Sequence, residues 1–370
     1  MKALALTNKG LEEFCEKEIK EKIKTSTTKI KENCVFFEAK DIDELCSFAY
    51  TSQTSAKVLL LIDEFSFRGQ QDLIKKASEK KQEIEKYISG KTFKVNTKRI
   101  GDHEFSSMDI SIEIGKDLEG EPDFKSPEVI VYVFINQDEA SISIDLIGFD
   151  SSKRNYKIFN HPQSIKGNVA FSLLMFAGYK KDRIVIDPFC GTGPIPIEAA
   201  LYSTDFPVNY YNKNQLLFSN IHKFDFEKSD KKISKENKDS IFAFDHQIRH
   251  VNSTKKNAKI AGINKSISIS KLGVRWLETK FDENSVDMIV THPPQLSKNT
   301  NPKEVEKVYD EFFYQVEFVL KKKGCVAILS KEKDLLSEKA EKYNFRLKES
   351  KEVMTGKEQM LFLKFEHNKI

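Results

Sequence analysis

From residue 183 onward, continuous apolar runs alternate with segments of helical length. The apolar runs are RIVIDPF, SIFAFDH, VDMIVTH and CVAILS. Strands of a parallel sheet are apolar on both sides because helices cover both faces. The C-terminal half is therefore predicted to be an α/β domain, with a hairpin over residues 347–365 at its end.

The first 150 residues differ, because shorter strand-like and helix-like segments follow one another there. This order suits α+β units rather than a parallel sheet. The second unit contains a basic strand at 91–100 and a helix that Ser106 is expected to cap, with Asp109 three residues later. The predicted parts are 1–66, 67–151, a connecting segment at 152–180, and 181–370 with a surface insertion at about 205–239.

Composition excludes several classes of protein. No apolar run approaches the roughly 18 residues of a membrane span, and the N-terminus becomes acidic too early for a secretion signal. Five scattered cysteines fit neither a disulfide framework nor a zinc pair, which predicts a reducing, cytoplasmic setting. A net charge of +4 permits an anionic partner without requiring one, and the dispersed histidines predict no metal site.

The stretch VIDPFCGTGPIPIEAA carries the strongest functional signal. A buried strand ends at Asp187, and a tight turn containing Gly191 and Gly193 leads into a helix that Pro194 can start. Ligands of doubly wound sheets bind beside such turns. The glycines are too few for a dinucleotide fingerprint, and Pro194 lacks an N–H that could hold phosphate, so a ligand without phosphates is favoured.

This stretch resembles the first motif of class I S-adenosylmethionine-dependent methyltransferases that modify amino groups of nucleic acids. IFAFDH is similar to their second strand, whose terminal acidic residue, here Asp245, holds the ribose hydroxyls. The connector stretch HPQS resembles a segment that closes over the methionine end of the cofactor, although a simple helix cap explains it equally well. The residues that the resemblance assigns to the cofactor are Asp187, Pro188, Cys190, Gly191, Gly193, Asp245, His246, His161, Pro162 and Ser164.

Upstream stretches narrow the resemblance. ALTNKGLEEFCEKEI and KVNTKRIGDHEFSSMDI are similar to tRNA methyltransferases that carry a THUMP domain, and the branch that forms N2-methylguanosine at tRNA position 6 is the most similar. The resemblance implies an α/β and α+β multidomain protein. A Rossmann-like methyltransferase domain would follow ferredoxin-like and THUMP domains, with tRNA as partner. The oligomeric state and any need for a small activating subunit stay open.

The sequence THPPQ departs from the family pattern. In this family the fourth strand ends in Asp or Asn, followed by Pro-Pro and an aromatic residue. The polar side chain and a proline carbonyl accept hydrogen bonds from the target amino group, while the aromatic ring stacks on the extruded base. By resemblance these catalytic positions fall on His292, Pro293, Pro294 and Gln295.

A neutral histidine still offers one acceptor nitrogen, which protonation would remove. Gln295 stacks poorly, and Phe189 or Tyr309 are alternative stacking residues. The third strand also lacks the family's acidic residue, since SKLG stands there. A second hypothesis therefore stays open, in which the chain binds tRNA through its THUMP domain and its methyltransferase domain is inactive or altered.

Basic residues of the strand at 91–100 and of the connector are candidates for RNA contact. Phosphate contacts of this kind position an RNA without recognising its sequence. In so lysine-rich a chain a solvated surface is the competing interpretation for each residue. The residues assigned to RNA are Lys94, Lys98, Arg99 and Arg154.

Overall fold

The computed structural model describes residues 1–25, 27–160, 164–234, 240–297 and 300–368. Its contacts divide the chain into two units, neither of which is continuous in sequence. Unit 1 comprises Met1–Thr7, Cys15–Ser151 and Asn209–Ser229, and unit 2 comprises Asn8–Phe14, Ser152–Val208 and Asp230–Ile370. Among the described residues, no helix has the length and apolar character that crossing a membrane requires.

Unit 1 is built on one eight-stranded sheet with the order β2-β3-β1-β4-β8-β7-β5-β6. Its strands are β1 (Lys2–Leu6), β2 (Thr28–Lys31), β3 (Cys34–Glu38), β4 (Lys57–Ser66), β5 (Thr92–Ile100), β6 (Glu121–Pro122), β7 (Val129–Asn136) and β8 (Glu139–Asp145). Its helices are α1 (Glu12–Ile23), which begins in unit 2, α2 (Ile42–Thr51), α3 (Gln70–Ser78), α4 (Lys81–Ile88), α5 (Ser107–Asp117) and α8 (Phe226–Asp230), which ends in unit 2.

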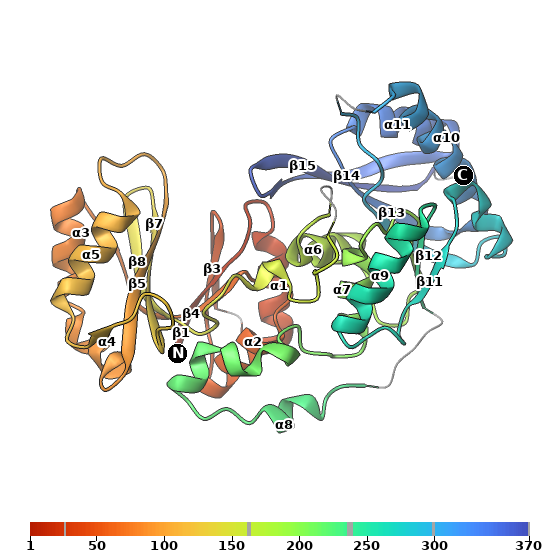
Figure 1. The fold of residues 1–370 in the computed structure, drawn as a ribbon. Coiled ribbons are helices and arrows are strands. Elements are labelled where there is room, and N and C mark those ends of the chain that lie inside the picture. The colour runs from red at the N-terminus through yellow and green to blue at the C-terminus, as the bar shows by residue number, and fades with distance from the viewer. Residues whose placement is uncertain (26, 161–163, 235–239, 298–299, 369–370) are drawn as a thin grey trace. The chain divides into compact units, whose positions relative to one another are not determined.

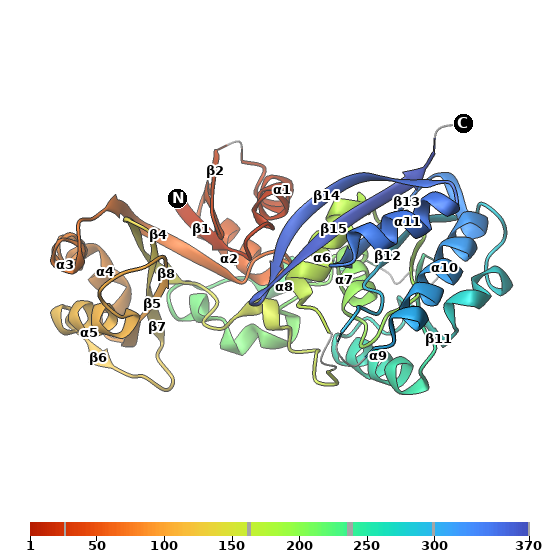
Figure 2. The ribbon, with the colours of Figure 1, turned by 90° about the horizontal axis from the view of Figure 1, so that it is seen from above.

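Strand β4 joins the two halves of this sheet. It pairs with β1 through Lys57–Leu60 and with β8 from Leu59 to Ser66, in both cases antiparallel. Figure 2 shows β4 as a long strand that serves both halves. The sequence-based boundary at residue 66 is therefore the end of a shared strand, and no division between compact units falls there.

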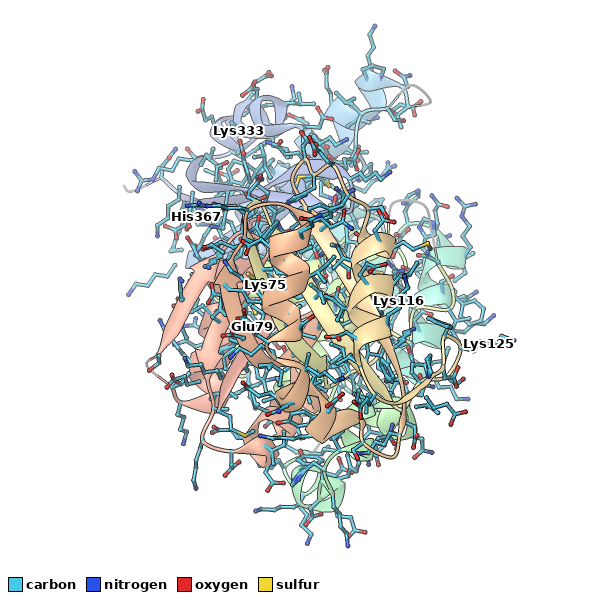
Figure 3. The ribbon with its side chains drawn as sticks, turned by 90° about the vertical axis from the view of Figure 1, so that its left-hand side faces the viewer. Lys75, Glu79, Lys116, Lys125, Lys333 and His367 are labelled. Atoms are coloured by element: carbon cyan, nitrogen blue, oxygen red, sulfur yellow. The ribbon has the colours of Figure 1, made fainter. Side chains whose placement is uncertain are left out.

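Helices α3, α4 and α5 cover one face of β5, β7 and β8 (Figure 1). Helix α5 begins with the expected capping box, in which Ser106 and Asp109 satisfy each other's backbone N–H groups. The outer faces of these helices are charged, as Lys75, Glu79 and Lys116 show in Figure 3. This part of unit 1 is thus amphipathic in the way that a helix layer over a sheet requires.

Unit 2 contains a seven-stranded sheet with the order β11-β10-β9-β12-β13-β15-β14. Its strands are β9 (Val185–Asp187), β10 (Ile241–Asp245), β11 (Ser268–Lys271), β12 (Val286–Thr291), β13 (Leu320–Ser330), β14 (Phe345–Thr355) and β15 (Glu358–His367). The first five are parallel to one another, and β15 is antiparallel to both β13 and β14. The predicted parallel sheet and terminal hairpin are confirmed.

Helices cover both faces of this sheet. They are α6 (Gly167–Ala177), α7 (Pro194–Ser203), α9 (Ile248–Ile260), α10 (Pro302–Val319) and α11 (Lys333–Lys342), with a 3-10 segment at Val274–Thr279. One core contains residues of α6, α7 and α9, and the other contains residues of α10 and α11. Because β10 and β12 both pair with β9 in parallel, the carboxyl ends of these three strands lie at one edge of the sheet.

Each unit also receives a segment from elsewhere in the chain. In unit 2, Leu11 and Phe14 enter the core beside Phe176 and Phe362, and the backbone of Met354 donates a hydrogen bond to the carbonyl of Lys9 at 2.9 Å.

In unit 1, the middle of the predicted insertion packs into the main core, where Phe218 is completely buried and Phe224 and Phe226 contact Tyr50. The expected surface insertion is therefore partly a core segment of unit 1.

Candidate functional site

The turn between β9 and α7 requires glycine at two positions. Gly191 and Gly193 have φ values of 55° and 88°, which residues with a Cβ rarely adopt. A Cβ on Gly193 would also lie 2.6 Å from the Cγ2 atom of Thr254. Pro194 occupies the first turn of α7, where its missing N–H has no intrahelical partner.

Two side chains of α9 hold this turn, and neither belongs to a motif that the sequence predicts to be functional. Thr254 Oγ1 donates to the Gly191 carbonyl at 2.9 Å. The fully buried Asn257 donates through Nδ2 to the carbonyls of Thr192 and Phe159, both at 2.9 Å, and its Oδ1 accepts from the Phe159 N–H at 3.1 Å. Polar residues three apart on one helix face were the available signal, but such spacing is common on helices.

Two carboxylates lie at the ends of neighbouring strands and bind nearby backbone. Asp245 accepts from the N–H groups of Gly191 at 3.1 Å and Gln247 at 2.8 Å. Asp187 accepts from Thr291 Oγ1 at 2.6 Å and from the Phe189 N–H at 3.2 Å. Burial raises the pKa of Asp187 to about 7. A positive charge on a ligand beside this carboxyl group would favour its ionised form.

The connector reaches the same turn through Ser164. Its Oγ lies 2.7 Å from Thr192 Oγ1. Lys157 donates to the carbonyls of Ser164 at 3.0 Å and Ile165 at 2.6 Å, and burial lowers the pKa of Lys157 to about 8. These contacts fix the backbone of the connector where it passes the turn.

His292 directly follows β12, and its ring has a defined tautomer. Its Nδ1 lies 2.8 Å from the carbonyl oxygen of Leu329. A carbonyl oxygen only accepts, so Nδ1 carries the proton and Nε2 of the neutral ring carries a lone pair. Burial lowers the pKa of His292 below its ordinary 6.5, which keeps the ring neutral at physiological pH.

Gln295 has a structural role that differs from the predicted one. Its side chain is buried, and its Oε1 accepts from Ser330 Oγ at 2.8 Å and from the Lys331 N–H at 3.0 Å. Its Nε2 donates to the Pro293 carbonyl at 2.7 Å. A buried amide whose hydrogen-bonding groups are satisfied in this way is unable to stack on a base. The prediction that Gln295 is a catalytic residue is therefore wrong, and its side chain instead holds the loop after β12.

The two aromatic residues proposed to stack on the base in place of Gln295 differ in how deeply they are buried. Tyr309 is completely buried and donates its hydroxyl to the Pro294 carbonyl at 2.6 Å, which excludes it as a stacking surface. Phe189 is partly exposed, and its ring centroid lies 5.7 Å from that of Phe312. Of these two rings, Phe189 is the one available to a ligand.

These groups surround a cavity of about 810 Å³ within unit 2. Predicted site residues on its lining are Ser164, Asp187, Cys190, Gly191, Asp245, His246, His292 and Pro294. Residues that the sequence analysis did not assign also line it, among them Thr192, Gln247, Arg249, His250, Thr300, Asn301, Glu304, Val305 and Val308.

The other predicted positions fall elsewhere. Four of them, Pro188, Gly193, Pro293 and Gln295, do not line the cavity. His161 and Pro162 lie outside the described residues. No described residue of β11 or of the turn after it lines the cavity, and the Leu272 N–H donates to the Asp245 carbonyl at 3.1 Å.

The residues predicted to contact RNA divide into separate groups. In β5, the register opposite β7 places Lys94 and Lys98 on the face away from helices α3 to α5, and Lys98 Nζ lies 5.8 Å from the centroid of the Phe134 ring. Arg99 alternates to the other face and donates to the His103 carbonyl at 3.1 Å.

The prediction that Arg154 contacts RNA is wrong, because its side chain is only 1% exposed. It binds both carboxylate oxygens of Glu198, at 2.8 and 3.0 Å. A guanidinium that is buried and paired with a carboxylate is unable to reach an RNA phosphate, so Arg154 has a structural role in unit 2.

The cavity fits S-adenosylmethionine as a ligand. The glycine turn allows close approach of the backbone, and Asp187 and Asp245 supply negative charge beside a donor that carries a sulfonium and an ammonium group. A volume of about 810 Å³ also leaves room for a second group next to such a ligand.

Comparisons with known proteins agree with this geometry. Residues 154–360 match the family model described as RMKL-like, methyltransferase domain, and residues 71–145 match the THUMP domain. A tRNA (guanine(6)-N2)-methyltransferase of Methanocaldococcus jannaschii is 31% identical over 280 residues, covering 72% of this chain and 73% of that protein.

Two solved structures share the fold over nearly the whole chain. TrmN from Thermus thermophilus has a TM-score of 0.76 at 20% identity and covers 99% of both chains. SMU.472, whose crystal structure is a complex with SAH, has a TM-score of 0.82 at 19% identity, and the match covers 100% of this chain and 98% of that one. With the family match over more than half its length, the chain belongs to the THUMP-containing, RMKL-like family of S-adenosylmethionine-dependent RNA methyltransferases.

Proposed function

We propose that this protein methylates the exocyclic N2 amine of a guanosine in tRNA, with position 6 of the acceptor stem favoured. The observation that carries the proposal is the hydrogen bond from His292 Nδ1 to the Leu329 carbonyl. It leaves an acceptor nitrogen, at the end of β12, on a residue that lines the same cavity as the glycine turn. The relative from M. jannaschii, named for this reaction, supports the choice of nucleotide.

S-adenosylmethionine, when bound, supplies a methyl carbon attached to a positively charged sulfur. His292 Nε2 accepts one N–H of the target amine and turns the nitrogen lone pair toward that carbon. Phe189 offers the base an apolar surface, in place of the aromatic residue that Gln295 replaces. As the new C–N bond forms and the C–S bond breaks, the amine proton passes to solvent, so the residues contribute mainly orientation.

The direct test is methylation of tRNA followed by nucleoside analysis. Purified protein, unmodified tRNA transcripts and labelled S-adenosylmethionine are expected to yield N2-methylguanosine, mapped to position 6 by fragment analysis. Label in another nucleoside would contradict the assignment to guanosine N2. Absence of transfer to any transcript, with cofactor binding retained, would favour a tRNA-binding protein with an inactive domain.

The tautomer of His292 predicts how transfer depends on pH. Only the neutral ring accepts a hydrogen bond, and burial lowers the pKa of His292 below 6.5. At saturating cofactor, the rate of transfer is therefore expected to be constant from pH 8 down to pH 6.5 and to fall as the pH drops further. In His292→Asn, whose amide oxygen accepts at every pH, this acidic decline should disappear. A decline that persists in His292→Asn would assign it to another group.

A further inference from the structure

One wall of the cavity is formed by described residues that lie between His292 and Val308 in the sequence. We call the lining residues His292, Pro294, Ser297, Thr300, Asn301, Glu304, Val305 and Val308 the acceptor wall. The N-cap Asn301 and the α10 residues Glu304, Val305 and Val308 follow the spacing i, i+3, i+4, i+7, so one face of the start of α10 borders the cavity. This wall lies on the β12 side, where the amine acceptor His292 stands.

The carboxylates that line the cavity differ in their burial and in the hydrogen bonds that they accept. Asp187 and Asp245 lie at the ends of β9 and β10, are buried, and accept hydrogen bonds from nearby backbone and Thr291. Glu304 belongs to the acceptor wall and is exposed. Within the described residues, its carboxylate has one weak hydrogen bond, from Asn301 Nδ2 at 3.5 Å. Glu304 therefore retains acceptor capacity toward a ligand.

The acceptor wall thus presents two acceptors, the imidazole nitrogen of His292 and the carboxylate of Glu304. Guanine carries two neighbouring donors, N1–H and the N2 amine, on one edge. Adenine has a lone pair at N1, which a carboxylate would repel. A site with two acceptors on one wall matches the guanine edge and mismatches adenine.

We infer that Glu304 selects guanine by accepting its N1–H while His292 accepts an N–H of the reacting N2 amine. This inference rests on the proposed function and adds the residue that determines base specificity. Glu304 does not take part in bond making. Its contribution is to hold the ring in one orientation and to disfavour bases that carry a lone pair at N1.

The test compares two acceptor bases that share the 2-amino group. The first substrate is the tRNA transcript with guanosine at the mapped position, and the second carries 2-aminopurine there, whose N1 is an acceptor. For the wild-type protein, kcat/KM is expected to favour guanosine by roughly 10- to 100-fold, the size of one well-placed base contact. In Glu304→Gln the amide can donate to N1 of 2-aminopurine, so the preference should fall to less than about threefold.

Glu306→Gln is the matched control, since Glu306 lies on the same helix, is exposed and does not line the cavity. It is expected to keep the wild-type preference. Using the same two RNAs for every variant cancels any difference in how easily each base leaves the stem. Calorimetry with S-adenosylhomocysteine should give similar affinities for wild type and Glu304→Gln.

The outcomes separate this inference from the proposed function. If the wild type methylates guanosine N2 and Glu304→Gln keeps the wild-type base preference, the role of Glu304 is wrong and the proposed function stands. A tenfold loss of cofactor affinity with unchanged preference would likewise overturn it and assign Glu304 to the cofactor. If the wild type leaves guanosine unmodified, the proposed function and this inference both fail.

Discussion

Replacing His292 by alanine is expected to lower kcat for methyl transfer to tRNA by at least roughly 100-fold, because a positioned acceptor of the amine is lost. His292 lines the cavity at the end of β12, whereas the glycine turn and Asp245 belong to the β9 and β10 ends of the sheet. The affinity for S-adenosylhomocysteine, measured by calorimetry, should therefore change little. The transfer rate is measured with labelled cofactor at saturating tRNA.

His292→Asn serves as the control that distinguishes a lost acceptor from a disturbed loop. Its amide oxygen can take the place of Nε2, and the asparagine variant should recover most of the lost rate. If His292→Ala transfers methyl groups as fast as the wild type, His292 is not the amine acceptor. If alanine and asparagine are equally inactive and bind cofactor weakly, the hydrogen bond to Leu329 maintains the loop and the lone pair has no special role.

Replacing Glu198 by alanine is expected to reduce the free energy of unfolding of unit 2 by about 3–5 kcal/mol, because a buried charge loses its partner. Glu198 is completely buried, binds Arg154 through two hydrogen bonds and accepts from the Tyr156 hydroxyl at 2.7 Å. Urea unfolding followed by the fluorescence of Trp276, the sole tryptophan and a residue of unit 2, measures the loss.

Glu358→Ala is the matched control for this measurement. Glu358 also pairs with a cation, Lys331, but both side chains are about half exposed. Exposed pairs contribute about 0–1 kcal/mol, so the control should unfold close to the wild type. Equal losses in the two variants would show that burial does not determine the contribution of the Arg154–Glu198 pair.

The order of elements in unit 2 was predictable because local sequence encodes it. Each apolar run from Val185, Ile241, Val286 and Cys325 formed a strand of the parallel sheet, and the final hairpin formed from residues that alternate in polarity. Periodicity carries this information over a few residues. It carries none about partners distant in sequence, and the pairing of β4 with both β1 and β8 therefore could not be predicted.

The candidate site was predictable to the same extent. The glycine turn after Asp187 follows from local pattern, whereas Asp245 and His292 were assigned by resemblance to a family. The structure brings Asp187, Gly191, Asp245 and His292 to one cavity. Supporting contacts were not predictable, because they join residues far apart. Gln295 binds Ser330, which lies 35 residues away, and Arg154 binds Glu198, 44 residues away. A glutamine after two prolines or an arginine in a basic connector gives no sign of such a partner.

The exchange of segments between the two units limits how the protein can be divided for experiments. Cutting the gene once after Ser151 would deprive the N-terminal product of Asn209–Ser229, including the fully buried Phe218. The C-terminal product would lack Leu11 and Phe14, which pack into its core. A ribosome must therefore have synthesised residue 229 before unit 1 can complete its core, so this core cannot close as soon as Ser151 has been added.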